Sequence, residues 1–207
     1  MHLIPKLIPL FSGKLPGPPH AFPQVVKRHL VIALAMTVCG LPLQCATLER
    51  LSLDDMIAKA TAIVRGKVTN AYAASSGPVI YTHYTIQVEE RLKGSGGATV
   101  EVVVPGGAAN GLRQSFAGAP VFRNGEDYVF FLWTGQSGLT QVLGLTQGLF
   151  AVAQDGSPDP VSTRQASREL MLDAKTGQPV KDQTLTMRLS ELRSRVASRL
   201  TGRGPVQ

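Results

Sequence analysis

Apolar and polar residues alternate with a period of two through the middle of the chain. The clearest example is "VIYTHYTIQVEERLKG", residues 79–94. One side of this segment holds Ile80, Tyr84, Ile86 and Val88, and the other holds Tyr81, His83, Thr85 and Gln87. Such alternation predicts a strand with one buried and one exposed face. We therefore expect the first set to lie in the core and the second set at the surface.

Further strands are expected on both sides of this segment. They are "TAIVRGKVTNAY" (61–72), "ATVEVVVPGG" (98–107), "DYVFFLWTG" (127–135) and one or two strands in "LTQVLGLTQGLFAVA" (139–153). Residues 127–135 are apolar on both faces, which is typical of a central, fully covered strand. Gly66 inside the first segment indicates a bulge or a bend. Closely spaced strands of this kind predict a mainly β fold, specifically a small five- to six-stranded OB-like barrel.

Two segments have the period of a helix. In "LSLDDMIAKA", Ser52 is a suitable N-cap for a short helix over 53–60, and acidic residues occupy its first turn. In "LTMRLSELRSRVASRL" (185–200), an apolar stripe is flanked by arginines. We expect this stripe to pack on its own domain or a partner, and contact with an anionic membrane is the alternative. Residues 154–165 and 173–183 are expected to be loops.

An apolar run at residues 30–43 follows Lys27 and Arg28. A positive region before a short apolar run is typical of a secretory signal, and the run is shorter than the ~20 residues of a usual spanning helix. We expect export to the periplasm or the medium. An uncleaved membrane anchor and a buried core helix are the alternatives. Residues 1–26, which are rich in proline up to residue 24, are expected to be a disordered leader. The alternative is that residues 1–24 precede a later true start at Val25 or Val26.

The chain therefore divides into four expected parts. These are a leader (1–26), a signal or anchor (27–46), a β-barrel domain (47–154) and a loop with a basic helical tail (155–207). Both cysteines lie in the second part, so removal of the signal leaves no disulfide framework.

Positive charge is concentrated at the two ends of the chain. The total is +7, yet residues 47–154 carry eight basic and eight acidic side chains. A nucleic-acid module should concentrate positive charge on its folded part. We therefore expect no nucleic-acid partner.

Several segments carry a resemblance to known proteins. They are "TAIVRGKV" (61–68), "ERLKG" (90–94), "VPGG" (104–107), "GAPVFRNGEDYVFFL" (118–132) and "GLTQGLFAV" (144–152). This order resembles exported bacterial proteins of unknown function and, distantly, the netrin-like, tissue-inhibitor-of-metalloproteinase barrel. The resemblance implies an OB-type fold. The zinc-chelating mechanism of those inhibitors is not implied, because Thr47 stands where their second cysteine would follow Cys45.

The sequence predicts no catalytic residue, metal ligand or cofactor. It contains no nucleophile elbow, zinc-protease motif, phosphate-binding loop or C-x-x-C pair. His83 is the only histidine after residue 46, and the carboxylates at 89–90 and 126–127 are adjacent pairs whose side chains diverge on a strand. A mechanism that needs converging acidic and basic groups is therefore not indicated.

Binding is the expected function, for a protein, a peptide or a cell-envelope component. The candidate residues are Tyr81, His83 and Gln87 on the exposed strand face, and Asn110 and Arg113 in the glycine-rich segment 104–120. The glycines could form an anion-binding nest beside Arg113, but a long hairpin that needs positive φ values is the expected reading.

Two alternatives stay open at the level of sequence. One is a hydrolase-like enzyme, which would need Asn110, Arg113, Ser115 and Glu126 to cluster in one polar pocket. The other is a structural protein anchored in the membrane by residues 30–43, with the basic C-terminal helix on the membrane surface.

Overall fold

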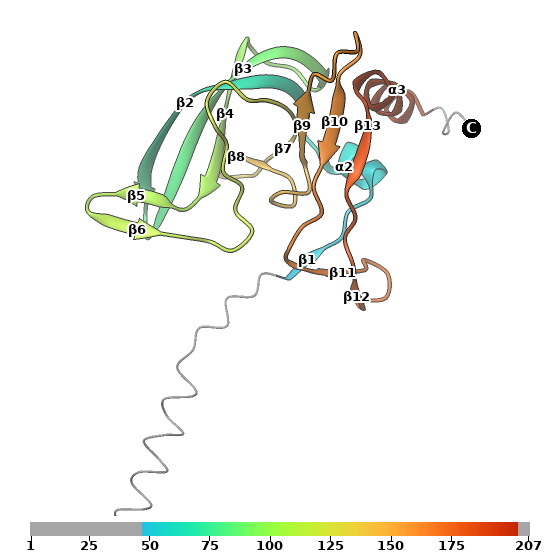
Figure 1. The fold of residues 1–207 in the computed structure, drawn as a ribbon. Coiled ribbons are helices and arrows are strands. Elements are labelled where there is room, and N and C mark those ends of the chain that lie inside the picture. The colour runs from blue at the N-terminus through green and yellow to red at the C-terminus, as the bar shows by residue number, and fades with distance from the viewer. Residues whose placement is uncertain (1–46, 203–207) are drawn as a thin grey trace, which may run out of the picture. The chain divides into compact units, whose positions relative to one another are not determined.

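Strands are the main regular structure of residues 47–202, the part of the chain that the computed structural model describes (Figure 1). The predicted mainly β fold is therefore confirmed. The expected leader (1–26) and signal or anchor (27–46) lie outside the described residues.

An eight-stranded antiparallel sheet forms the body of the domain. Its strands are β2 (Ala62–Ser76), β3 (Val79–Lys93), β4 (Thr99–Pro105), β7 (Asp127–Thr134), β8 (Thr140–Val142), β9 (Leu149–Ala153), β10 (Val161–Arg164) and β13 (Leu185–Arg188). The hydrogen-bonded order is β13-β10-β9-β7-β2-β3-β4, and β8 pairs with β7 beside this path. Smaller sheets are formed by β1 (Thr47–Glu49), β11 (Leu170–Leu172) and β12 (Pro179–Val180), and by the hairpin β5 (Gly107–Ala109) and β6 (Leu112–Gln114).

The sheet curls but is not a closed barrel (Figure 1). Strand β8 lies beside β4, yet β4 and β13 are the two ends of the hydrogen-bonded path. The finer prediction of a five- to six-stranded OB-like barrel is thus not confirmed. The physical reason is that β9, β10 and β13 extend the sheet on the far side of β7 and leave it open.

Strand β7 separates two hydrophobic cores. Val129 and Phe131 are fully buried in a core that lies under the two helices. Tyr128, Phe130 and Leu132 point the opposite way, into the core enclosed by the curl of β2, β3 and β4. The prediction that this strand is central and covered on both faces is confirmed.

Helix α2 (Leu53–Lys59) begins where its sequence predicts. The Ser52 hydroxyl accepts a hydrogen bond from the Asp55 backbone N–H at 3.1 Å, and the Asp55 carboxylate accepts one from the Ser52 N–H at 3.2 Å. This reciprocal capping box satisfies two backbone donors of the first turn. The Ser52 hydrogen bond also lowers the pKa of Asp55. The helix buries Met56 and Ile57 against the sheet.

Helix α3 (Leu189–Leu200) starts four residues later than the sequence pattern predicts. Residues 185–188 form β13, which pairs with β10, and the Leu189 N–H then donates to the Pro160 carbonyl at 2.9 Å. Sheet pairing therefore overrides the local helical pattern at this point. Of the predicted apolar stripe, Leu189, Leu192 and Val196 are buried in the domain's own core, whereas Leu185 belongs to β13 and packs partly buried against it. Within residues 47–202, neither helix is long and apolar enough to cross a membrane.

The two segments expected to be loops, residues 154–165 and 173–183, contain the strands β10 and β12 and belong to the same compact unit as the rest of the domain. The loop prediction was wrong at these two places because β10 and β12 are only four and two residues long, too short to produce a periodic pattern. The Arg164 side chain of β10 is buried, and it donates to the Asp182 carboxylate at 2.7 Å. A buried ion pair of this kind joins β10 to the segment before β13.

Candidate functional site

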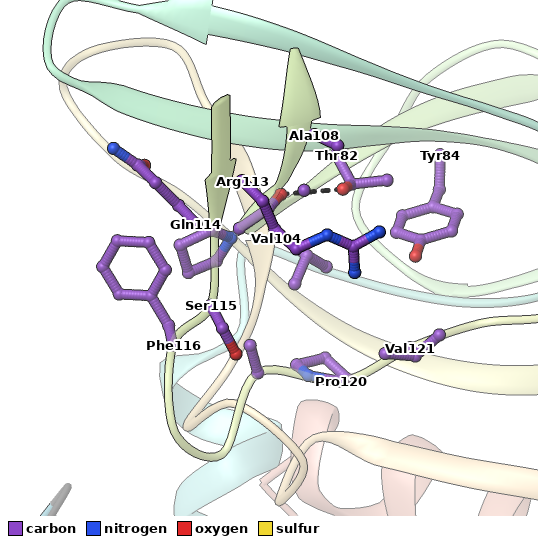
Figure 2. Close-up of a pocket in the computed structure, with 14 residues that line it drawn as sticks. Thr82, Tyr84, Val104, Ala108, Arg113, Gln114, Ser115, Phe116, Pro120 and Val121 are labelled. Carbon is purple, nitrogen blue, oxygen red and sulfur yellow. Dashed lines mark hydrogen bonds between the residues drawn. The ribbon is translucent and has the colours of Figure 1, made fainter. Parts of the chain in front are cut away.

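A pocket of about 320 Å³ opens between the β5–β6 hairpin, segment 115–121 and the adjoining ends of β3 and β4 (Figure 2). We call it the hairpin pocket. It is lined by Thr82, Tyr84, Val104, Pro105, Gly106, Gly107, Ala108, Arg113, Gln114, Ser115, Phe116, Ala119, Pro120 and Val121. Residues 104–107 and 119–121, which are far from each other along the sequence, therefore meet at this pocket.

The Gln114 side chain holds the hairpin against the tip of β2 and β3. Its Oε1 accepts a hydrogen bond from the Ile80 N–H at 2.7 Å, and its Nε2 donates to the Pro78 carbonyl at 2.8 Å. The Gly106 N–H donates to the Ile80 carbonyl at 2.7 Å, and the Thr82 hydroxyl donates to the Gly106 carbonyl at 2.8 Å. These bonds position one wall of the pocket without a ligand.

The glycines of this segment allow the backbone conformation of the hairpin. Gly106 and Gly107 have φ values of +109° and +136°, a region that residues with a Cβ rarely adopt. A Cβ on Gly107 would lie 2.7 Å from the Thr82 hydroxyl oxygen. Because the Gly106 N–H is already bonded to Ile80, it is not free to face an anion. The expected reading, a hairpin that needs positive φ values, is confirmed.

Two hydrogen-bonding side chains extend into the hairpin pocket. Figure 2 shows the guanidinium of Arg113 and the hydroxyl of Tyr84 reaching into the space that the lining residues surround. The Tyr84 ring is only 6% exposed and packs edge-on against Phe122, with 4.7 Å between the centroids. Among residues 47–202, no hydrogen bond or ion pair involves the guanidinium of Arg113, which is a solvent-exposed residue, or the hydroxyl of the buried Tyr84. Both groups are available to a ligand.

The rest of the lining combines the polar side chains of Thr82, Gln114 and Ser115 with apolar side chains and main chain. Phe116 and Val121 are 43% and 79% exposed, although both are large hydrophobic side chains. No lining residue is acidic, so the pocket carries the single positive charge of Arg113. The site thus combines an uncompensated cation with exposed apolar surface, an arrangement that favours a ligand with an anionic and an apolar part.

A second pocket of about 510 Å³ adjoins the first. The two pockets share Ala119, Pro120 and Val121. Arg168 and Glu169 line the second pocket together with residues of β9, β10 and the segment that follows β10. A ligand longer than the hairpin pocket therefore has a continuous surface on which to extend.

The opposite face of β2, β3 and β4 carries a smaller cluster of polar and aromatic groups. The Tyr72 and His83 rings are stacked, with 4.7 Å between their centroids and 11° between their planes. Glu101 accepts a hydrogen bond from the Tyr72 hydroxyl at 3.1 Å and lies 3.0 Å from the His83 Nδ1. The His83 contact, followed by that of Tyr72, lowers the pKa of Glu101, and the same Glu101 contact raises the pKa of Tyr72.

The candidate binding residues of the sequence analysis fall into three places. Tyr81, His83 and Gln87 are on the outward face of β3, as the alternation predicts. Arg113 lines the hairpin pocket on the other side of the sheet. Asn110 is at the hairpin turn, with its Nδ2 3.4 Å from the Ser75 Oγ. The structure therefore does not bring the five residues together in one site.

The cluster that a hydrolase-like enzyme would need is also dispersed. Arg113 and Ser115 line the hairpin pocket, whereas Asn110 and Glu126 do not. The Glu126 carboxylate instead accepts a hydrogen bond from the Tyr128 hydroxyl. Burial, together with this hydrogen bond, strongly raises the pKa of Tyr128. Within the described stretch, no three His, Cys, Asp or Glu side chains are grouped as a metal would require.

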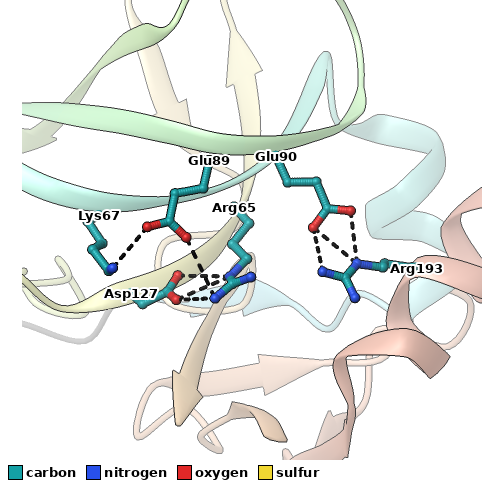
Figure 3. A network of polar contacts seen from close by, with 6 residues as sticks. All are labelled: Arg65, Lys67, Glu89, Glu90, Asp127 and Arg193. Carbon is teal, nitrogen blue, oxygen red and sulfur yellow. Dashed lines mark hydrogen bonds and ion pairs between the residues drawn. The ribbon is translucent and has the colours of Figure 1, made fainter. Parts of the chain in front are cut away.

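A further charged network has a structural role (Figure 3). Arg193 of α3 donates to the Glu90 carboxylate through Nε and Nη2, at 2.8 to 3.0 Å. Nearby, Arg65 pairs with Asp127 at 2.6 Å and Lys67 pairs with Glu89 at 2.9 Å. These carboxylates compensate cations of the sheet and of α3, so the network joins the helix to β3.

No protein family, curated protein or solved structure matches this chain. Evidence about function therefore comes from the geometry of the pockets.

The sequence pattern missed the pocket residues Thr82, Tyr84, Phe116 and Val121. Tyr84 was expected only as a core residue, and its ring is indeed in the core. The available signal was its hydroxyl, because a buried tyrosine usually places its O–H at a partner or at solvent. Phe116 and Val121 belong to an irregular segment, where no period distinguishes an exposed apolar residue from a buried one.

Proposed function

We propose that this protein is an exported, non-catalytic binding domain that holds a segment of a protein or peptide in the hairpin pocket. The observation that carries the proposal is the pairing of two unpartnered donors, Arg113 and Tyr84, with the exposed apolar side chains Phe116 and Val121 in a preformed cavity. Peptides offer both carboxylate and carbonyl acceptors and apolar side chains, so they match each part of this lining.

The chemistry of the lining favours binding over catalysis. The polar groups are one guanidinium, one amide and the hydroxyls of threonine, serine and tyrosine. General acid–base catalysis near neutral pH usually employs histidine, a carboxylate, lysine or cysteine, and nucleophilic catalysis needs a base beside the nucleophile. The groups present are instead suited to hydrogen bonding with a ligand.

The scaffold supports the same proposal. We propose that the curled strands β2, β3, β4, β7 and β8 correspond to the OB-like barrel that the resemblance implies, with the hairpin pocket at its mouth. OB-type folds bind ligands on a sheet face and its adjoining loops. A pocket wall held by Gln114 loses little conformational entropy when a ligand binds, which favours affinity.

Site-specific photo-crosslinking tests the function directly. A benzophenone side chain at Val121 in the full chain should form adducts with a protein segment in the native host, whereas one at the exposed Lys175 should not. Ala108→Trp, which places a large side chain in the pocket, should abolish the Val121 adduct. Adducts that consist only of lipid or glycan, or that persist in Ala108→Trp, would contradict the proposal.

We further propose that the domain works outside the cytoplasm, on the basis of the apolar run at residues 30–43 and the cations before it. The N-terminal sequence of the natural protein, measured separately in soluble and membrane fractions, tests this. A soluble species that begins near Ala46 supports export. An intact run in the membrane fraction supports the alternative, a membrane-anchored protein.

A further inference from the structure

We propose that the hairpin pocket recognises the carboxy-terminal residue of a peptide, with the free carboxylate at Arg113 and Tyr84 and an apolar side chain against Phe116 and Val121. This inference rests on the proposed function, namely that a protein or peptide segment occupies the hairpin pocket. It adds which part of the peptide enters and what chemistry selects it.

The positive charge of Arg113 favours an anionic group on the ligand. Arg113 lies in a lining without any acidic residue, and no group within residues 47–202 pairs with its guanidinium. The planar fork of N–H donors on arginine matches the two oxygens of a carboxylate. The Tyr84 hydroxyl, which also extends into the pocket, supplies one more donor (Figure 2). The buried Tyr84 ring keeps this donor in place, because it is packed against Phe122.

The size of the cavity indicates that the carboxylate and the apolar group belong to the same residue. A volume of about 320 Å³ is near the lower end of ligand pockets, which run from ~300 to ~1,000 Å³. This space suits one amino-acid residue with its acyl group. Phe116, Val121 and Val104 form apolar walls of the same cavity that Arg113 enters. An apolar residue at the end of a chain can bind Arg113 through its carboxylate and pack its side chain on the apolar walls. An aspartate or glutamate side chain can bind only Arg113.

The residues that precede the last one in such a peptide can leave the hairpin pocket along the surface that it shares with the second pocket. The hairpin pocket and the second pocket share Ala119, Pro120 and Val121. A peptide whose last residue is in the hairpin pocket can therefore continue across Pro120 and Val121 toward the second pocket. The backbone leaves the first cavity as an acylated amino group, which is uncharged and needs no acidic partner.

Three matched probes test the inference by NMR titration of the isotope-labelled full chain. They are N-acetylphenylalanine, its carboxamide, and N-acetyl-aspartyl-phenylalaninamide, which carries its carboxylate on a side chain. The free acid should shift the amide signals of residues 82–84, 104–108 and 113–121, with a Kd on the order of 1 mM for so small a ligand. The two amides should bind at least about tenfold more weakly, because they lack the terminal carboxylate.

Variants assign the effect to the two donors. Arg113→Gln should abolish the preference for the free acid. Tyr84→Phe keeps the buried ring but removes the hydroxyl, so it should raise the Kd for N-acetylphenylalanine by about threefold to tenfold. Arg123→Gln is the matched control, because Arg123 is an exposed arginine outside the lining that lies 3.8 Å from Glu126, and it should leave the preference intact.

The possible failures differ from one another. Equal binding of acid and carboxamide would overturn the carboxylate inference and leave the proposed function in place. If N-acetyl-aspartyl-phenylalaninamide bound as tightly as N-acetylphenylalanine, the assignment of the carboxylate to the chain terminus would be overturned. If no probe shifts the pocket signals while the Val121 crosslink to a protein persists, only this inference is overturned. If the crosslink is also absent, the proposed function fails with it.

Discussion

The side-chain amide of Gln147 completes the hydrogen bonding of a segment 96 residues away, since its Oε1 accepts the Leu51 N–H at 2.8 Å. Its Nε2 donates to the Glu49 carbonyl at 2.9 Å, and the whole residue is 1% exposed. The turn before β9 therefore holds the chain as it enters α2.

Gln147→Ala should destabilise the domain by about 1–3 kcal/mol, because it leaves the buried Leu51 N–H and the partly buried Glu49 carbonyl without this partner. The free energy of unfolding from urea titration measures this effect. Gln154→Ala, at an exposed position of the same residue type, should change it by less than about 0.5 kcal/mol. Equal values for the two variants would show that water replaces the Gln147 amide.

The buried pair Arg164–Asp182 leads to a second prediction. The two side chains are 2% and 1% exposed, and in the described part of the chain the Nε and Nη1 of Arg164 have no partner. Burial raises the pKa of Asp182, but hydrogen bonds from the Ser167 N–H and from Arg164 outweigh it and lower the pKa overall.

Arg164→Met should cost about 3–5 kcal/mol of unfolding free energy, since it removes the nearest cation from the buried Asp182 carboxylate and leaves only Arg50, whose Nε is 3.9 Å away. The double variant Arg164→Met/Asp182→Asn should recover part of that loss, because no uncompensated charge stays buried. Arg168→Met, an exposed arginine nearby, is the control and should stay within about 0.5 kcal/mol of the parent. If the double variant is as unstable as the single one, the cost is not electrostatic.

The docking of α3 predicts a contrast between two leucines of one helix. Leu192 is fully buried and Leu200 is 47% exposed. Leu192→Ala should destabilise the domain by about 2–5 kcal/mol, whereas Leu200→Ala should change its stability by about 0.5 kcal/mol or less. Thermal unfolding followed by circular dichroism measures both. Similar melting temperatures would mean that α3 contributes little to the core.

Alanine substitutions at two hairpin glycines with positive φ values distinguish the cost of backbone strain from the cost of a steric clash. A Cβ on Gly107 would meet Thr82 Oγ1 at 2.7 Å, whereas a Cβ on Gly111, at φ +74°, would have no atom within 4 Å. Gly111→Ala should cost about 1–2 kcal/mol from strain alone. Gly107→Ala should cost more and should also shift the NMR signals of Thr82 and Tyr84. Unchanged pocket signals in Gly107→Ala would show that the hairpin adjusts without moving the pocket wall.

The contact between His83 and Glu101 predicts a change in pH dependence. The folded state has a lowered pKa for Glu101, chiefly through His83. The ionised Glu101 therefore contributes fully to the folding free energy at a pH above 4.5, its ordinary pKa. This contribution is lost as the pH falls through the lower pKa that Glu101 has in the folded state. His83→Phe retains a ring that can stack on Tyr72 and should move the pKa of Glu101 up toward 4.5, as measured by NMR of its carboxyl carbon. Tyr81→Phe is the control, and an equal shift there would contradict the assignment.

Local rules explain what could be predicted from the sequence. The Ser52–Asp55 cap and the doubly apolar strand at 127–135 depend on neighbouring residues, and both have the predicted structure. The start of α3 depends instead on pairing between β13 and β10, which no local pattern encodes. The burial of Arg164 also depends on distant residues. An arginine in a short polar segment is normally exposed, and here the Asp182 carboxylate and the Gln183 carbonyl accept its hydrogen bonds.

The site was less predictable than the fold for a geometric reason. Successive side chains of a strand point to opposite faces, so Tyr81 and Tyr84 cannot serve the same surface. The alternation placed Tyr81 and His83 outward as the structure has them. It could not show that the hairpin carrying Arg113 folds over the other face, because that depends on the Gln114 bonds to Pro78 and Ile80.

Strand β7 has a practical consequence for anyone who dissects this protein. Its Phe131 side closes the helical core and its Phe130 side closes the core that contains Phe122 and the Tyr84 ring. A minimal ligand-binding fragment therefore cannot be made by removing α3, because this would open the core that contains Phe131, and the same strand contributes Phe130 to the core that contains the Tyr84 ring. A substitution far from the hairpin pocket can therefore abolish binding through the shared strand, and a stability measurement must accompany every binding measurement.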